Sequence, residues 1–250
     1  MSKIKRYNRK DQIGKNVKNF LHSGNPNKFM VLQHLIDIHK SRGDKILIFI
    51  DYVDILVEYA RRLGYPYISG DLKNYEREKI IQFFKHLGGD WNVLFLSRVG
   101  DVGIDLPDAN VAIEVSSLFG SRRQEAQRLG RILRPKEKKQ GETYQSYFYT
   151  LVSLATSEVK YSFKRQKFLI EQGYNFKILN EEELPYNKDP SYKKRFKMST
   201  EESQRKFLEE LLITSSQREK DKPDSSSMNN NSKTVFKMRE RNDGNVFIDR

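Results

Sequence analysis

The stretch Lys45–Ile50 (KILIFI) constrains the fold of this chain more than any other part of the sequence. After its first residue the run is uninterruptedly apolar, which is typical of a strand that is covered on both faces. Segments with helical spacing of apolar residues lie on either side of it, at residues 28–40 and at residues 53–63. A buried strand between two helices predicts a parallel sheet with helices on both of its faces.

The alternation of short apolar runs and helical segments continues to about residue 180. The other expected strands are residues 65–68, 92–96, 110–115, 143–151 and 175–179, and the other expected helices are residues 76–86, 121–133 and 158–171. We therefore predict one α/β domain over residues 26–180, built on a mostly parallel sheet. Ligands of such sheets bind at the carboxyl ends of the strands.

The flanking segments differ from this domain in composition. Residues 1–25 are rich in Lys, Arg and Asn, and we interpret them as a mobile basic lead-in. Residues 181–250 are expected to be a linker and a largely irregular, flexible tail, because they are charged, broken by proline and polar toward the end. Within them, a capping-box pair, Ser199 and Glu202, predicts one short amphipathic helix over about residues 199–213, docked on the domain or on a partner.

Composition limits the classes of function. The formal net charge of +13 over 250 residues favours a polyanionic partner. The chain has no cysteine, which excludes disulfides, thiol catalysis and Cys-ligated metals. We expect no metal site, because the four histidines, His22, His34, His39 and His86, lack metal-ligand spacing and are interpreted as ordinary helix or loop residues. No apolar run could span a membrane and no signal peptide is visible, so we expect a soluble, intracellular protein.

The segment Gln124–Pro135 (QEAQRLGRILRP) has the features of a phosphate site. Wound as a helix at about 100° per residue, it gathers polar and basic residues on one stripe and apolar residues on the other side. The stripe holds Gln124, Gln127, Arg131 and Arg134. A planar guanidinium group that is always charged matches the oxygens of a phosphoryl group. A solvated basic face is the alternative, because charge patterns are weak signals on their own.

A loop with two glycines follows the strand expected at residues 92–96. Residues 97–107 (SRVGDVGIDLP) also hold a hydroxyl group and two carboxylates. The glycines allow backbone amides to approach a phosphate or sugar, Ser97 can donate to a phosphate oxygen, and Asp105 can accept from a ribose hydroxyl. The local alternative is a turn with positive φ in which Asp105 caps a short helix. Pro107 excludes a dinucleotide-binding fingerprint.

Together, the loop and the arginine segment stand in the order of motifs V and VI in the second RecA-like lobe of superfamily 2 helicases. Residues 120–134 (GSRRQEAQRLGRILR) most closely resemble the XPB (xeroderma pigmentosum group B) family, the DNA helicases of transcription factor IIH. The resemblance spans about residues 25–180 and includes NPNKF at 25–29 and YFYTLVS at 147–153. It implies the fold of a RecA-like C-terminal helicase lobe.

The resemblance also implies roles for individual residues. Arg131 and Arg134 match arginines that reach across the interlobe cleft to the γ-phosphate of ATP, where a guanidinium group stabilises the charge of the transferred phosphoryl group. The remaining residues form two groups: Gln127, Asp105 and Gly103 on the side of the nucleotide, and Ser97, Arg98, Gly100, Arg122 and Arg123 on the side of the nucleic acid.

Two parts of a complete helicase motor are not found in this sequence. One is the Gly-x-x-x-x-Gly-Lys-[Ser/Thr] phosphate loop, since the pair Gly14-Lys15 is followed by Asn16, and the other is the Asp-Glu pair that binds magnesium. We therefore expect ATP and Mg2+ to be held mainly by a first lobe, in cis or in trans. The chain alone is expected to be inactive as an ATPase.

The expected function is that of the C-terminal lobe of an ATP-dependent DNA helicase or translocase that acts in promoter opening and nucleotide excision repair. Its expected location is the nucleus, and its expected partners are the DNA backbone and other subunits of a transcription factor IIH-like complex, without a membrane. Two alternatives stay open. One is a stand-alone nucleic-acid-binding or regulatory module whose arginines grip a backbone, and the other is a docking subunit that recruits partners through residues 199–213 or the tail.

Overall fold

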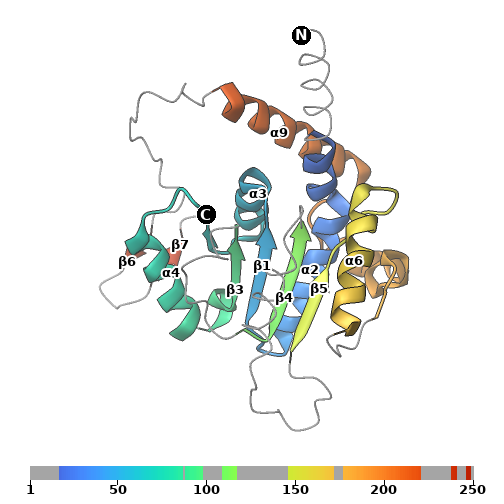
Figure 1. Ribbon diagram of the computed structural model, residues 1–250. Helices are drawn as coiled ribbons and strands as arrows, with labels where there is room; N and C mark the ends of the chain where they lie inside the picture. Colours follow the sequence, from blue (N-terminus) through green and yellow to red (C-terminus); the bar gives the residue numbers. More distant parts are fainter. Residues whose placement is uncertain are drawn as a thin grey trace.

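The computed structural model describes residues 17–86, 88–97, 109–116, 146–171, 177–220, 238–240 and 246–248. Its centre is a five-stranded parallel sheet with the strand order β2-β3-β1-β4-β5 (Figure 1). The strands are β1 (Ile46–Ile50), β2 (Tyr67–Ile68), β3 (Val93–Leu96), β4 (Val111–Ser116) and β5 (Tyr147–Thr150). The predicted parallel α/β class is thereby confirmed.

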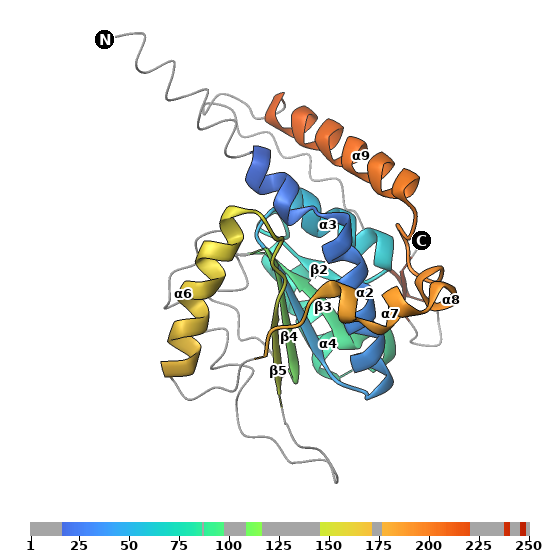
Figure 2. The same ribbon diagram turned by 90° about the vertical axis from the view of Figure 1, so that its right-hand side faces the viewer.

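Helices lie on both faces of this sheet. α2 (Pro26–Ser41) and α3 (Val53–Leu63) pack on one face, and α4 (Asn74–His86) packs on the other. α6 (Ser157–Glu171) lies on the opposite side of the sheet from α2, as Figure 2 shows. A 3-10 turn, η1 (Gly89–Asn92), leads into β3.

The central strand β1 contributes to two separate cores. Its even-numbered residues, Ile46, Ile48 and Ile50, join the cluster under α2 and α3. Its odd-numbered residues, Leu47 and Phe49, join the cluster under α4, because successive side chains of a strand point to opposite faces. All five side chains are at most 1% exposed. This double burial explains why the apolar run in the sequence is uninterrupted.

Local signals in the sequence account for the ends of the helices. At the start of α2, the side chain of Asn25 accepts a hydrogen bond from the N–H of Asn27 at 3.0 Å, and Pro26 occupies the first turn, where no N–H partner is needed. At the end of α3, Gly64 adopts a left-handed conformation with φ of 76° and donates its N–H to Ala60 C=O.

The segment predicted to be a linker is packed against the domain instead. After residue 180 the chain forms three short turns, η3 (Glu181–Glu183), α7 (Pro185–Lys188) and α8 (Pro190–Lys193). Tyr186 is fully buried and Phe196 is 5% exposed, and both pack in one cluster with Met30 of α2. Because this segment is rich in charged residues, its composition did not indicate that its aromatic side chains pack against the domain.

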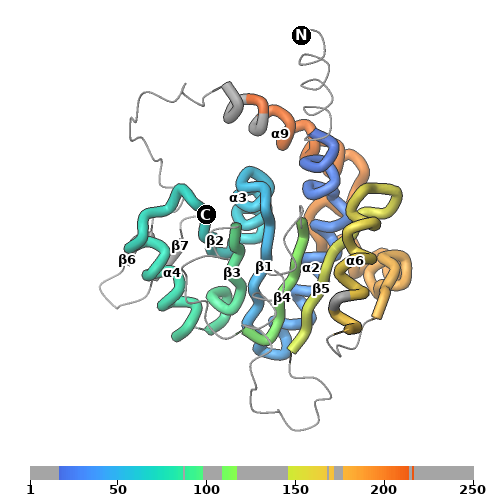
Figure 3. Tube along the Cα trace, in the orientation of Figure 1, coloured from blue at the N-terminus to red at the C-terminus, as the bar shows by residue number. Residues whose placement is uncertain are grey.

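The amphipathic helix of the tail is longer than predicted and is capped differently. α9 spans Glu201–Lys220, and its cap is formed by Thr200 and Ser203, whose side chains accept hydrogen bonds from each other's N–H groups at 3.3 Å. Ser199 and Glu202 are therefore not the capping pair. Phe207 and Leu211 of α9 are buried in the core under α2 and α3. Figure 3 shows α9 passing beside residues 17–23.

Three further predictions about the ends of the chain change. Residues 17–23 of the predicted lead-in are helical, and Phe20 is only 8% exposed because it joins the main core. Residues 177–179, predicted to end a strand, have no regular structure. Within the predicted flexible tail, β6 (Met238–Glu240) pairs antiparallel with β7 (Val246–Ile248). None of the described helices is long and apolar enough to cross a membrane.

Candidate functional site at the carboxyl edge of the sheet

Small polar residues collect at the carboxyl edge of the parallel sheet. Asp51 follows β1, Ser69 follows β2, Ser97 follows β3, Ser116 ends β4 and Ser153 comes shortly after β5. The four serines are between 1% and 7% exposed. Because the strands are parallel, all five residues lie at the same edge, which is the edge where sheets of this kind bind ligands.

Hydrogen bonds fix the middle of this edge. The N–H of Ser97 donates to Ile68 C=O at 3.0 Å, which ties β3 to β2. The N–H of Asp51 donates to the hydroxyl oxygen of Ser116 at 2.9 Å, which ties β1 to β4. Ser97 is the predicted site residue that falls within the described ranges, and the structure places it at this edge with 3% exposure.

The other predicted site residues lie outside the described residues, so their roles stay predictions. They are Arg98, Gly100, Gly103, Asp105, Arg122, Arg123, Gln127, Arg131 and Arg134. The structure does describe where their segments start, directly after Ser97, which follows β3, and directly after Ser116, which ends β4. These strands flank β1, so the two segments start two strand spacings apart, about 10 Å.

A buried ion pair that sequence reasoning missed lies beside the end of β4. The ammonium group of Lys28 donates to both carboxylate oxygens of Glu158, at 2.8 and 2.7 Å, and to Val115 C=O at 2.9 Å. Glu158 also accepts from the N–H of Ser153 at 2.9 Å. Lys28 is 4% exposed, and this burial lowers its pKa while the neighbouring carboxylate opposes the shift. The pair joins α2, β4 and the start of α6.

Asn25 connects the start of α2 to the same place. Its side-chain amide donates to the hydroxyl oxygen of Ser153 at 3.1 Å, and that hydroxyl group donates to His22 C=O at 3.2 Å. The C=O of Asn25 accepts from the hydroxyl group of Tyr59 at 3.2 Å. Asn25 and Lys28 belong to the NPNKF stretch and Ser153 ends the YFYTLVS stretch, so the resemblance marked these residues without revealing their contacts.

A second buried ion pair holds β4 from the other face of the sheet. Arg165 of α6 contacts Glu114 at 3.0 Å, and Glu114 is 3% exposed. Lys28 thus holds the backbone of β4 at Val115, and Arg165 holds the side chain of the preceding residue, Glu114. The strand that leads into the arginine segment is held on both sides.

Arg77 brings a further positive charge to this edge. It belongs to α4, and its guanidinium group donates to Gly70 C=O, in the loop after β2, at 2.8 Å. Its Nε atom is buried and has no hydrogen-bond partner in the described part of the chain. No pattern in the sequence distinguished Arg77 from the other basic residues of the helix.

The histidines of α2 have packing roles. The ring of His34 lies against Tyr186 and Phe196. His39 contacts Asp44 through Nδ1 and the hydroxyl group of Tyr149 through Nε2, each at 2.9 Å. Over the ranges that the structure describes, no group of His, Cys, Asp and Glu could hold a metal ion.

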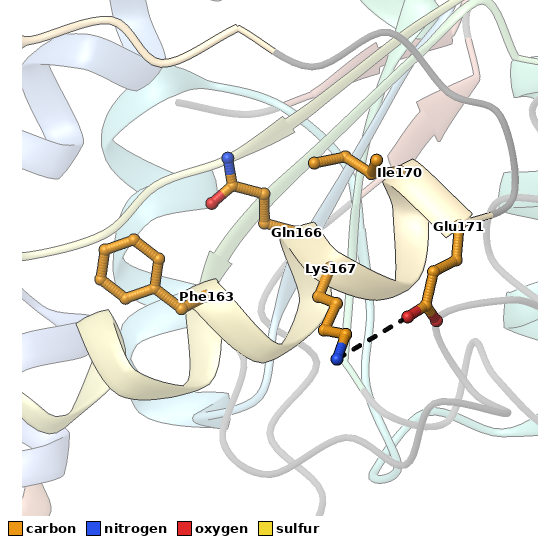
Figure 4. A pocket seen from close by; sticks show the side chains of 5 residues that line it. All are labelled: Phe163, Gln166, Lys167, Ile170 and Glu171. Carbon is orange, nitrogen blue, oxygen red and sulfur yellow. Dashed lines mark ion pairs between the residues drawn. The ribbon is translucent and has the colours of Figure 1, made fainter.

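A hollow of about 390 Å³ lies along α6, away from the carboxyl edge of the sheet (Figure 4). It is lined by Phe163, Gln166, Lys167, Ile170 and Glu171. Phe163 is 61% exposed and Ile170 is 54% exposed, and Lys167 pairs with Glu171 at 4.0 Å. Its lining is mainly apolar and holds no residue predicted for the site.

Comparisons with known proteins identify a family that matches most of the chain. Residues 3–239 match the family described as ERCC3/RAD25/XPB C-terminal helicase. The chain is 48% identical over 195 residues to the general transcription and DNA repair factor IIH helicase/translocase subunit XPB of Danio rerio, a match that covers 78% of this chain and 24% of that protein. The subunit of the same name in Dictyostelium discoideum is 51% identical over 177 residues, covering 71% of this chain and 22% of that protein.

Among solved structures, the C-terminal domain of the DEAD-box protein Dbp5 is similar, with 21% identity and a TM-score of 0.46 over 57% of this chain and 79% of that chain. The chain spans about a quarter of the length of the two XPB subunits that it matches.

Proposed function

The chain belongs to the ERCC3/RAD25/XPB C-terminal helicase family, and from this membership we propose that it acts as the second RecA-like lobe of an ATP-dependent DNA helicase or translocase. One observation carries the proposal. The two segments with helicase motifs both leave the carboxyl edge of the parallel sheet, after Ser97 and after Ser116. This edge is where a bound phosphate or nucleic acid is expected.

The proposed chemistry is phosphoryl transfer completed in trans. Arg131 and Arg134 donate to the γ-phosphate of an ATP molecule that a first lobe holds together with Mg2+. Charge on the transferred phosphoryl group is spread over its oxygens, and a guanidinium finger is worth on the order of 10³–10⁵ in rate. Gln127, Asp105 and Gly103 contact the nucleotide from the same lobe.

The proposed nucleic-acid surface consists of Ser97, Arg98, Gly100, Arg122 and Arg123. These residues bind the DNA backbone, so binding is independent of base sequence. The net charge of +13 supports this choice of partner. The names of the two XPB subunits place those proteins in general transcription and DNA repair factor IIH. For this chain we propose a complex of the same kind, in the nucleus, acting in promoter opening and excision repair.

The docking alternative loses part of its candidate surface. Phe207 and Leu211, two of the apolar residues of 199–213, are buried in the core of this same chain, where Phe207 packs on Phe29 and Tyr59, whereas Leu212 and Ile213 are exposed. The alternative of a non-catalytic nucleic-acid-binding module makes a separate prediction. If it were right, substituting Arg131 or Arg134 would weaken DNA binding as much as substituting Arg122 does.

The test is reconstitution of ATP hydrolysis. The chain is mixed with a purified first lobe of an XPB-family helicase, and DNA-stimulated ATPase activity is measured. We expect activity from the mixture, none from either part alone, and a loss of at least about 10³-fold with Arg134→Ala. Arg205→Ala is the matched control, because Arg205 is 84% exposed on α9. Normal turnover with Arg134→Ala, or no turnover from a folded wild-type pair, would contradict the proposal.

A further inference from the structure

The end of β4 is held by side chains where the regular strand ladder breaks. The pairing of β1 with β4 shifts register between Phe49 and Ile50, opposite the last residues of β4. At this point Lys28 donates to Val115 C=O, and the hydroxyl group of Ser116 accepts from the N–H of Asp51. These two hydrogen bonds hold the last residues of β4, where the chain leaves the sheet.

Stability alone is a weak reason for a buried ion pair at this position. The cost of removing two charges from water often equals their attraction, and well-packed apolar residues can replace such a pair without loss of stability. An ammonium group offers something that an apolar side chain does not, namely directed hydrogen bonds. Lys28 uses them to hold Val115 C=O and the Glu158 carboxylate at once.

Glu158 extends this connection to the strand on the other side of β4. Its carboxylate accepts from the N–H of Ser153, just after β5, while it binds Lys28. The exit of β4 is thus fixed relative to α2, to α6 and to the chain that follows β5. The segment that starts at this exit carries Arg131 and Arg134.

We propose that Lys28 and Glu158 are positioning residues, which fix the exit of β4 and thereby the start of the segment that brings the arginines to the phosphoryl group. The catalytic part of this inference rests on the proposed function. The structural part, that the ion pair fixes the end of β4, can be tested on the chain alone.

The variants are chosen to separate positioning from stability. Lys28→Met keeps the length of the side chain but removes its hydrogen bonds. The double variant Lys28→Met/Glu158→Gln also removes the unpaired carboxylate, while the amide oxygen of the new side chain can still accept from Ser153. We expect it to regain much of the melting temperature lost by Lys28→Met. The control is His39→Asn, which disturbs a buried network at the opposite end of α2.

The first measurement is hydrogen exchange at the amides of Val115 and Ser116 in the chain alone. We expect exchange at least about tenfold faster in Lys28→Met and in the double variant, and unchanged in the control. Unchanged exchange in both Lys28 variants would overturn the inference, whatever the ATPase results.

The second measurement is steady-state ATP hydrolysis with the first lobe, well below the melting temperature of every variant. We expect kcat to fall about tenfold in both Lys28 variants with KM for ATP changed by less than about twofold, because the arginines act in the transition state. Recovery of kcat together with melting temperature in the double variant would show a purely structural role and overturn the inference. An inactive wild-type pair would refute the proposed function, and hydrogen exchange would then decide whether the ion pair fixes β4.

Discussion

A Cβ atom built on Gly24 would lie 2.9 Å from Cδ1 of Leu211, so α9 packs directly on the backbone that leads into α2. The same atom would lie 3.5 Å from Cδ1 of Ile55 in α3. Gly24 therefore sits where three helical segments meet.

Gly24→Ala should be mildly destabilising and Gly24→Val clearly so. The alanine methyl group requires only a rotation of the Leu211 side chain, whereas valine overfills the contact, at a cost of ~1–3 kcal/mol. Urea denaturation measures the free energy of unfolding of both variants. Combining Gly24→Ala with Leu211→Ala should give a smaller loss than the sum of the single losses, since Leu211→Ala removes the clash. Simple additivity would mean that the two residues do not touch.

Phe207→Ala should strongly destabilise the whole domain. Its ring is 1% exposed and lies 6.2 Å from the ring of Phe29 and 5.8 Å from that of Tyr59. Truncating such a buried aromatic side chain costs ~3–5 kcal/mol. Ile213→Ala on the same helix is the control, because Ile213 is 58% exposed and should change the free energy of unfolding by less than ~0.5 kcal/mol. Equal effects of the two variants would show that α9 is not part of the core.

Stability should fall as the pH drops below about 6.5, the usual pKa of histidine. Burial lowers the pKa of His39, and this effect exceeds the opposing influence of Asp44. Between about pH 6.5 and the lowered pKa of His39, the unfolded chain binds a proton at this residue and the folded chain does not. The folded state therefore loses stability as the pH falls through this window.

The groups that face His39 are Asp44, Arg42, Tyr149 and Tyr147. His39→Gln should flatten the dependence of the free energy of unfolding on pH below about pH 6.5. Burial also lowers the pKa of His34, so a His34→Gln variant should flatten it further. If the slope of the free energy of unfolding against pH were unchanged in both variants, the pH dependence would not come from His39 and His34.

DNA binding by the chain alone should be weak, independent of sequence and strongly dependent on salt. Each phosphate neutralised by Lys or Arg releases a counterion, which gives a slope of about −0.9 per contact in a plot of log affinity against log salt for duplex DNA. Fluorescence anisotropy with two unrelated duplexes, at salt concentrations from about 50 to 200 mM, measures this slope. A flat response would argue against a surface that follows the DNA backbone.

The sequence predicted those parts of the fold that depend on local patterns. The uninterrupted apolar residues of β1 predicted a strand buried on both faces, and α3 has the predicted bounds, Val53–Leu63, which end at the left-handed Gly64. The helix that carries Phe207 was predicted to dock on this domain or on a partner, and it packs on α2 of this domain. The docking of the predicted linker was missed, because Tyr186 packs on α2 from more than 150 positions away in the chain. The composition of such a segment shows that it is charged but does not show which part of the fold it packs against.

The same limit applies to the candidate site. Motif order predicted that the segments after Ser97 and after Ser116 carry the site, and the parallel topology places the ends of β3 and β4 at one edge. The contacts of Lys28 with Val115 and Glu158 join residues 87 and 130 positions apart, and no periodicity connects them. A lysine within an amphipathic helix is expected to face solvent, so its burial could be recognised only in three dimensions.

The packing of α9 on α2 and α3 has a consequence for synthesis on the ribosome. Phe29 and Tyr59 leave the exit tunnel well before Phe207, whose ring covers them. Until that residue emerges, the nascent lobe displays an apolar surface that a truncated product would display permanently. A premature stop codon shortly after residue 180 would therefore yield an aggregation-prone polypeptide and a target for quality control, even though the five-stranded sheet is fully encoded upstream of it.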